Sequence, residues 1–193
     1  MKKKSRLVGN QLRIIAGEWR GRKLIFPDVD GLRPTPDRVR ETVFNWLQSV
    51  IPGAECLDLF AGSGAMGFEA LSRGAAYVTM IERDASAVHA LRMNLEVLKA
   101  DNRARLIQGD ALVRLADLPA NSVDILFLDP PYGKGLITKV WHQLEQNNVL
   151  KEGALIYLEQ EMPLQTADLP ENRVILKQKQ AGQVNYYLLQ STS

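Results

Sequence analysis

Cysteine is almost absent from this sequence of 193 residues, because Cys56 is the single one. One cysteine excludes an internal disulfide and a cysteine-rich metal site, and it fits a reducing compartment. The two histidines, His89 and His142, lie in predicted helices without evident partners, so we expect no metal site. No apolar run approaches the roughly 18 residues of a membrane span, and none follows the basic first six residues as in a signal peptide. We therefore expect a cytoplasmic protein without a membrane partner.

Acidic residues are scarce in the first forty positions. These hold eleven Lys and Arg against four Asp and Glu, and the remaining 153 hold thirteen against eighteen, so the formal charges are +7 and −5. A solvated tail would explain the basic residues up to position 6, but the later ones interleave with apolar and turn residues. Such a cationic patch most often binds a phosphate backbone. The candidate substrate contacts are Arg13, Arg20, Arg22, Arg33 and Arg38, with Lys23 and Arg40 in the same stretch.

Two short apolar and basic runs, residues 12–17 and 20–26, predict an N-terminal β-hairpin. An isolated hairpin is unstable in water, so we expect it to pack on the main domain. Trp19 lies in its turn and is expected either to stack on a bound base or to pack inside the fold.

A helix is predicted after the hairpin, with Thr35 as its N-cap, Pro36 at its first position and Asp37 near the positive end of its dipole. It should extend to about residue 49. The apolar spacing predicts one buried face made of Val39, Val43, Trp46, Leu47 and Val50.

From residue 56 onward, strand and helix patterns alternate, which predicts a doubly wound, mostly parallel α/β sheet of the Rossmann-like kind. Strands are expected at residues 56–60, 77–81, 105–108, 123–128 and 154–158, and helices at 65–73, 86–99, 111–118 and 137–147. Residues 174–178 and 184–190 predict an antiparallel C-terminal hairpin. We divide the chain into a small basic extension, residues 1–52, and a main domain, residues 53–193.

A glycine-rich turn follows the first strand of this alternating region. It contains a G-x-G-x-x-G pattern that begins at Gly62 and Gly64, and Glu82 closes the next strand where an acid would bind ribose hydroxyls. Asp58 precedes the turn and would repel a pyrophosphate, whereas it would attract the ammonium and sulfonium groups of S-adenosylmethionine. We therefore favour that cofactor over NAD or FAD, and over a turn that serves only packing.

Two further acids follow predicted strands. Asp110 is placed either to accept from the adenine amino group of the cofactor or to cap the next helix, and the sequence leaves both open. Asp129 opens an Asp-Pro-Pro-Tyr sequence, in which Pro130 and the next proline must end the strand in a rigid loop. A carboxylate, the Pro130 carbonyl and the aromatic Tyr132 together suit a planar ring that carries an amine.

These motifs resemble a known family. Residues 129–132 look like the Pro-Pro-aromatic motif of S-adenosylmethionine-dependent amino-group methyltransferases, and residues 58–64 look like their cofactor loop. Residues 13–22, 32–41 and 181–184 narrow the likeness to the RsmD family, the bacterial 16S ribosomal RNA guanine-N2 methyltransferases. The resemblance extends over nearly the whole chain.

The resemblance implies a role for each motif. Asp58, Gly62 and Gly64 would hold the cofactor's methionine end, Glu82 its ribose and Asp110 its adenine, and Phe60 would also contact the cofactor. Asp129 and Pro130 would grip the target amino group while Tyr132 stacks on the base. The implied partner is 16S ribosomal RNA, within the small subunit or an assembly intermediate.

Three alternatives stay open. The same chemistry could act on DNA adenine or on a protein glutamine, although glutamine enzymes typically have Asn in place of Asp129. A ribosome assembly factor with a vestigial site would keep the basic extension but not need the acids. A nicotinamide dehydrogenase would use the glycine turn for a different cofactor.

Overall fold

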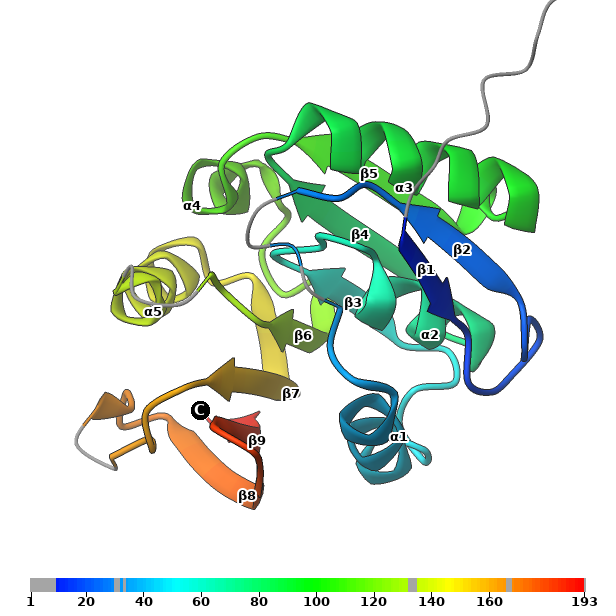
Figure 1. The fold of residues 1–193 in the computed structure, drawn as a ribbon. Coiled ribbons are helices and arrows are strands. Elements are labelled where there is room, and N and C mark those ends of the chain that lie inside the picture. The colour runs from blue at the N-terminus through cyan, green and yellow to red at the C-terminus, as the bar shows by residue number, and fades with distance from the viewer. Residues whose placement is uncertain (1–9, 30–31, 33, 132–134, 166–167, 193) are drawn as a thin grey trace, which may run out of the picture.

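A mixed sheet of seven strands forms the centre of the molecule (Figure 1). The structure is a computed structural model that describes residues 10–29, 32, 34–131, 135–165 and 168–192. The strand order is β5-β4-β3-β6-β7-β9-β8, in which the first five are parallel and β9 is antiparallel to both neighbours. The strands are β3 (Glu55–Asp58), β4 (Tyr77–Glu82), β5 (Ala104–Gln108), β6 (Val123–Leu128), β7 (Leu150–Gln160), β8 (Arg173–Ala181) and β9 (Val184–Ser191). The predicted doubly wound α/β fold with an antiparallel C-terminal hairpin is confirmed.

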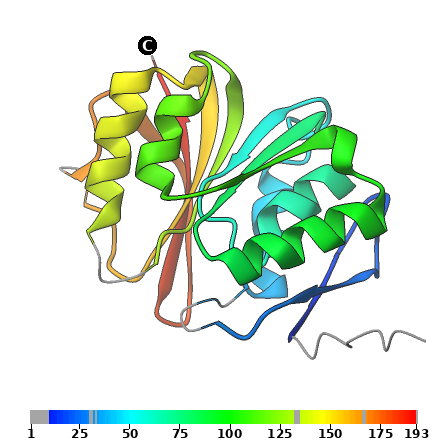
Figure 2. The same ribbon diagram turned by 90° about the horizontal axis from the view of Figure 1, so that it is seen from above.

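Helices cover both faces of the sheet, as Figure 2 shows from above. One face carries α1 (Asp37–Trp46), α2 (Ala65–Ser72) and α3 (Ala85–Leu98), and the other carries α4 (Ala111–Arg114) and α5 (Leu136–Asn147). Alternate strand residues enter two buried clusters: Phe127 and Tyr157 lie under α1 to α3, whereas Leu128 and Leu158 lie under α5. Because side chains alternate along a strand, a strand covered on both faces is apolar throughout.

The strand order reverses at β3, which pairs with β4 on one side and with β6 on the other. All three strands are parallel, so their carboxyl ends meet at one edge of the sheet. In open α/β sheets this edge, at the point of reversal, is where ligands bind.

The predicted N-terminal hairpin is present as antiparallel strands β1 (Asn10–Arg13) and β2 (Lys23–Phe26). It docks on α2, where the Glu69 carboxylate accepts the backbone N–H groups of Ile15 at 2.8 Å and Ala16 at 3.1 Å. Gly17 has φ +82°, and a Cβ there would lie 1.8 Å from the carbonyl oxygen of Ser72. Glycine is therefore required where the hairpin meets α2.

Arg40 joins the hairpin, α1 and α2 in one buried network. Its fully buried guanidinium donates to Asp37 at 2.6 Å and to the Arg13 carbonyl at 2.8 Å, and lies 3.6 Å from Glu69. Arg40 consequently does not contribute to a surface patch, although the sequence grouped it with the basic residues that do.

Three expectations for α1 are wrong. Pro36, not Thr35, is its N-cap, and no side chain caps the helix. The helix ends at Trp46, so Val50 lies beyond it with 43% of its surface exposed. Trp46 is partly buried rather than central, and its ring stacks on Tyr186 with centroids 5.6 Å apart. The Thr35 hydroxyl is unavailable to the helix because it hydrogen-bonds the carboxylate of Asp129 instead.

The remaining observations concern α4, two tryptophans and membrane-spanning helices. The predicted helix at residues 111–118 becomes a short α4 followed by a 3-10 turn, Leu115–Asp117. Trp19 is buried, and the guanidinium of Arg103 lies 4.9 Å from its ring centroid, so the packing alternative holds. Trp141 is buried in the core. In the part of the chain that the structure describes, no helix combines the length and apolarity that crossing a membrane requires.

Candidate active site

Acids from several strand ends gather at the reversal of the strand order. Asp58 ends β3, Glu82 ends β4 and Asp129 directly follows β6. The loop before α1 borders them, because Leu32 lies beside Gly62 and Thr35 hydrogen-bonds Asp129. The N-terminal extension therefore supplies one side of the site.

The glycine turn between β3 and α2 is closed by hydrogen bonds. The Glu82 carboxylate accepts the N–H of Gly62 at 2.8 Å and that of Asp84 at 2.8 Å. Gly62 and Gly64 have φ +51° and +77°, and a Cβ on Gly64 would lie 2.4 Å from the Phe68 ring. Positive φ and close packing both require glycine here. The turn thus holds backbone close to Glu82, as a nucleoside site requires.

Asp58 is a buried carboxylate with 4% of its surface exposed. It accepts the N–H of Gly67, in the first turn of α2, at 3.0 Å. Burial raises the pKa of Asp58 to about 7, and the nearby Glu82 charge adds to the effect. Among the described residues no Lys or Arg forms an ion pair with it. A buried carboxylate without a basic partner is suited to a cationic ligand.

Asp110 caps α4, which realises one of the two roles that the sequence left open. Its carboxylate accepts the N–H groups of Leu112 at 2.9 Å and Val113 at 3.4 Å. Phe60, in the glycine turn, is half-buried and packs against the cluster under α5. Both residues lie at carboxyl ends of strands, on the same edge of the sheet as Asp58.

Asp129 is half-buried directly after β6, and Pro130 beside it is buried. The pKa of Asp129 is raised well above its usual range, first by burial and then by the charges of Glu159 and Asp58, while the hydrogen bond from Thr35 opposes this. Tyr132 lies outside the described residues. The carboxylates of Asp58 and Asp129 are therefore close enough for the charge of one to raise the pKa of the other. Ligands bound at the two carboxylates would lie close together, as a transfer between them requires.

Two residues at this site escaped the sequence analysis. Thr35 was predicted to be the N-cap of the helix, although its position between two prolines could have suggested a conformationally constrained residue whose hydroxyl has another partner. Glu159 directly follows the predicted strand at residues 154–158, just as Asp129 follows the strand at residues 123–128. This shared position at a strand end could have marked Glu159 as a candidate site residue.

The candidate RNA contacts lie apart from the acids. Arg13, Arg20, Arg22 and Arg38 are exposed on or beside the hairpin and α1, and Arg33 lies outside the described residues. Arg22 reaches the carbonyl of Val97 on α3 at 3.5 Å. The hairpin thus presents arginine side chains to solvent.

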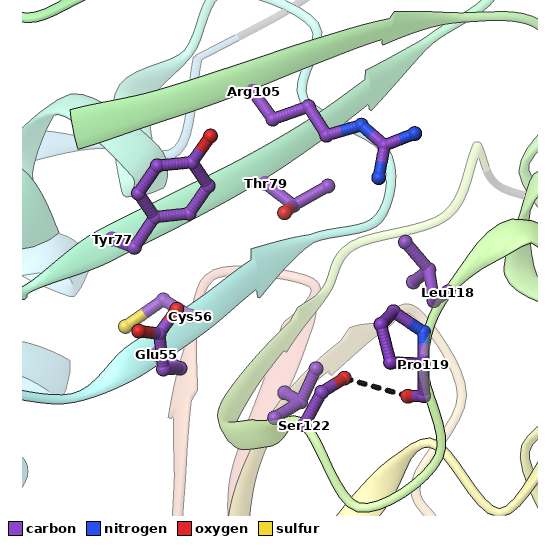
Figure 3. Close-up of a pocket in the computed structure, with 9 residues that line it drawn as sticks. Glu55, Cys56, Tyr77, Thr79, Arg105, Leu118, Pro119 and Ser122 are labelled. Atoms are coloured by element: carbon purple, nitrogen blue, oxygen red, sulfur yellow. Dashed lines mark hydrogen bonds between the residues drawn. The ribbon is translucent and has the colours of Figure 1, made fainter. Parts of the chain in front are cut away.

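A hollow of about 230 Å³ lies at the opposite, amino end of the sheet (Figure 3). Glu55, Tyr77 and Arg105 come from the starts of β3, β4 and β5, and Ser122 beside it donates to the Pro119 carbonyl at 2.7 Å. None of the predicted site residues lines it. It lies at the end of β3 opposite to Asp58 and is therefore separate from the acids.

The chain is similar to known proteins in both sequence and fold. The family model described as conserved hypothetical protein 95 matches residues 12–190. Ribosomal RNA small subunit methyltransferase D from Escherichia coli is 50% identical over 190 residues, which span 98% of this chain and 95% of the relative. The Haemophilus influenzae protein of the same name is 46% identical over 94% of each chain. The solved structure of the putative methyltransferase yhhF from Escherichia coli superposes with a TM-score of 0.85 at 46% identity, covering 95% of this chain and 99% of its own.

Proposed function

The chain belongs to the conserved hypothetical protein 95 family, the RsmD family of methyltransferases, and we propose that it methylates the exocyclic N2 amino group of a guanine in 16S ribosomal RNA. The observation that carries the proposal is the meeting of a buried Asp58 at the end of β3 with Asp129 and Pro130 at the end of β6. Asp58 suits a cationic methyl donor, and Asp129 suits an amine.

The donor in this proposal is S-adenosylmethionine. The residues fit it, because Asp58 is buried, has no basic partner among the described residues and would attract an ammonium. A pyrophosphate would instead be repelled by the same carboxylate. In this proposal Glu82 binds the ribose hydroxyls and Asp110 the adenine amino group, and Phe60 also contacts the cofactor. When bound, the cofactor supplies an electrophilic methyl group.

Asp129 and the Pro130 carbonyl accept the two N–H groups of the target amine. The N2 lone pair of guanine is delocalised into the ring, so the amine is a poor nucleophile. Two acceptors fixed on a rigid loop favour a pyramidal nitrogen, and they stabilise the positive charge that grows on it during transfer. In this proposal the N2 atom gains the methyl group and loses one proton, and the carboxylate of Asp129, in its ionised form, would accept that proton.

The base must leave its stack to reach Asp129, and Tyr132 would replace part of the lost stacking. In this proposal residues 1–52 dock the RNA and residues 53–193 perform the transfer. Exposed arginines on the hairpin would bind phosphates. The substrate is RNA within the small subunit or an assembly intermediate, and the reaction takes place in the cytoplasm.

The decisive experiment incubates the protein with labelled S-adenosylmethionine and small subunits that lack the modification, and then identifies the labelled nucleoside. N2-methylguanosine is expected. Label in N6-methyladenosine, or in protein alone, would refute the proposal. Asp129→Ala should slow transfer by about a hundredfold or more, because it removes a preoriented acceptor, and should leave cofactor affinity nearly unchanged.

A second experiment tests the docking role of the hairpin. Replacing Arg20 and Arg22 with Ala should weaken RNA binding and lower its salt slope by about 1.4 to 1.8, since each lost phosphate contact accounts for roughly 0.7 to 0.9. Lys139→Ala, an exposed cation on α5, is the matched control and should leave the slope unchanged. An equal slope in the arginine variant would exclude phosphate contacts by these residues.

A further inference from the structure

Glu159 lies beside the acceptor loop although no motif marks it. Strands β6 and β7 pair in parallel with Leu128 opposite Leu158, so Asp129 and Glu159 are the next residues of adjacent strands. Glu159 is 4% exposed, and its charge is the largest single electrostatic contribution to the raised pKa of Asp129. Two acids therefore meet at the place where the amine is expected.

The position of Glu159 is fixed by the residues around it. The Tyr157 hydroxyl, two residues earlier on the same face of β7, donates to its carboxylate at 2.5 Å. Across the antiparallel pair with β9, Glu159 faces Tyr186, whose ring stacks on Trp46 of α1. A carboxylate accepts several hydrogen bonds at once, so the bond from Tyr157 does not exclude a further donor.

Burying two carboxylates side by side is unfavourable unless hydrogen-bond donors compensate them. The Thr35 hydroxyl supplies one donor to Asp129, and Tyr157 supplies one to Glu159. A ligand that brings two adjacent N–H groups would supply one more to each acid. Among the nucleobases, guanine has this arrangement, because its ring N1–H and its amino N2–H point the same way.

We propose that Glu159 is the residue that selects guanine, by accepting the N1–H of the base while Asp129 accepts an N2–H. This inference rests on the proposed function and adds to it the contact that distinguishes the base. Adenine has a lone pair at N1 where guanine has a hydrogen, and that lone pair would face the Glu159 carboxylate. Two acceptors that face each other form no hydrogen bond and repel, so adenine is rejected.

The test compares two bases that both carry the 2-amino group. Once nucleoside analysis has located the target, the RNA is prepared with guanosine or with 2-aminopurine riboside at that position. 2-Aminopurine has no hydrogen on N1. The wild-type protein should methylate guanosine roughly ten- to a hundredfold faster, which is the discrimination typical of a well-formed base contact.

Glu159→Gln is the informative variant, because its amide offers both an oxygen acceptor and an N–H donor. The preference for guanosine should fall to about threefold or less, since the amide can pair with either form of N1. 2-Aminopurine also lacks the O6 atom, but that loss affects wild type and variant alike and cancels when their preferences are compared. Glu161→Gln, an exposed acid two residues on, is the matched control and should keep the wild-type preference.

The outcomes separate the two proposals. If wild type forms no N2-methylguanosine, the proposed function fails and this inference with it. If wild type methylates guanosine but Glu159→Gln keeps the full preference, the inference alone is overturned. If Glu159→Gln does not bind the cofactor, Tyr157→Phe is tested in its place. Losing the Tyr157 hydroxyl removes a hydrogen bond that holds Glu159, so the preference for guanosine over 2-aminopurine should fall severalfold. An unchanged preference in Tyr157→Phe would also reject the assignment.

Discussion

Cofactor affinity is expected to depend on the ionisation of Asp58, whose pKa is raised to about 7 by burial. In the proposed complex the ionised carboxylate attracts the ammonium of S-adenosylmethionine, so a protonated Asp58 must lose its proton before it can form this ion pair. Affinity should then fall as the pH drops below 7. For a pKa of 7, the apparent Kd at pH 6.0 is about eightfold higher than at pH 7.5, or about 1.2 kcal/mol.

The assay is isothermal titration of the whole protein between pH 6.0 and 7.5. Because a ligand ammonium with an α-amino pKa of about 7.7 is partly neutral at pH 7.5, Kd is expressed at each pH in terms of the ammonium form of the ligand. S-Adenosylhomocysteine, which keeps the ammonium but lacks the sulfonium charge, should show the same dependence on pH. Asp58→Asn keeps the size of the side chain and can still accept the N–H of Gly67, but it carries no charge. Its Kd should be about tenfold or more above wild type at pH 7.5 and flat with pH.

Two results would refute this reasoning. A wild-type Kd that does not change between pH 6.0 and 7.5 would show that Asp58 is either ionised throughout or remote from the ammonium. A pH dependence that persists in Asp58→Asn would assign the titration to another group, and the raised pKa of Asp129 makes that carboxyl the first to examine.

Three further predictions concern stability. Without cofactor, the pKa of Asp58 is higher in the folded than in the unfolded state, so wild type loses stability as pH rises from about 4 to about 7, and the loss levels off above 7. Asp58→Asn does not ionise and should exceed wild type by roughly 3 to 4 kcal/mol at neutral pH in urea titrations. Glu69→Ala should cost about 3 to 5 kcal/mol in the same assay, because it leaves buried cations and amides without their acceptor; a cost below 1 kcal/mol would contradict the structure. Gly17→Ala should lower the thermal midpoint of unfolding far more than Gly21→Ala. Both glycines have φ +82°, so an alanine at either position costs about 1 to 2 kcal/mol of stability, but only an alanine at position 17 would collide with the Ser72 carbonyl. Equal midpoints would disprove that contact.

Local patterns were enough for the architecture. The strand at residues 123–128 has the bounds predicted for it, because a continuous apolar run ends at two prolines and both signals are local. The helix at Ala65–Ser72 and the C-terminal hairpin likewise follow from turn residues and periodicity. The position of Asp58, Glu82 and Asp129 at strand ends was also predictable, since parallel strands bring their carboxyl ends to one edge.

Side-chain partners were not predictable in the same way. Thr35 had every local feature of an N-cap, yet its hydroxyl bonds Asp129 because the loop before α1 packs over the end of β6. Arg40 looked like one more surface cation, and its burial follows from the docking of the hairpin on α2.

The sequence by itself therefore determined the α/β sheet, the glycine turn and the three acids at its edge, because backbone propensities and turn chemistry act within a few residues. Only the tertiary structure decided which groups share an environment: Glu159 beside Asp129, and Asp58 buried enough for its pKa to reach about 7. The reason is physical, since burial and charge coupling depend on neighbours in space that are distant along the chain.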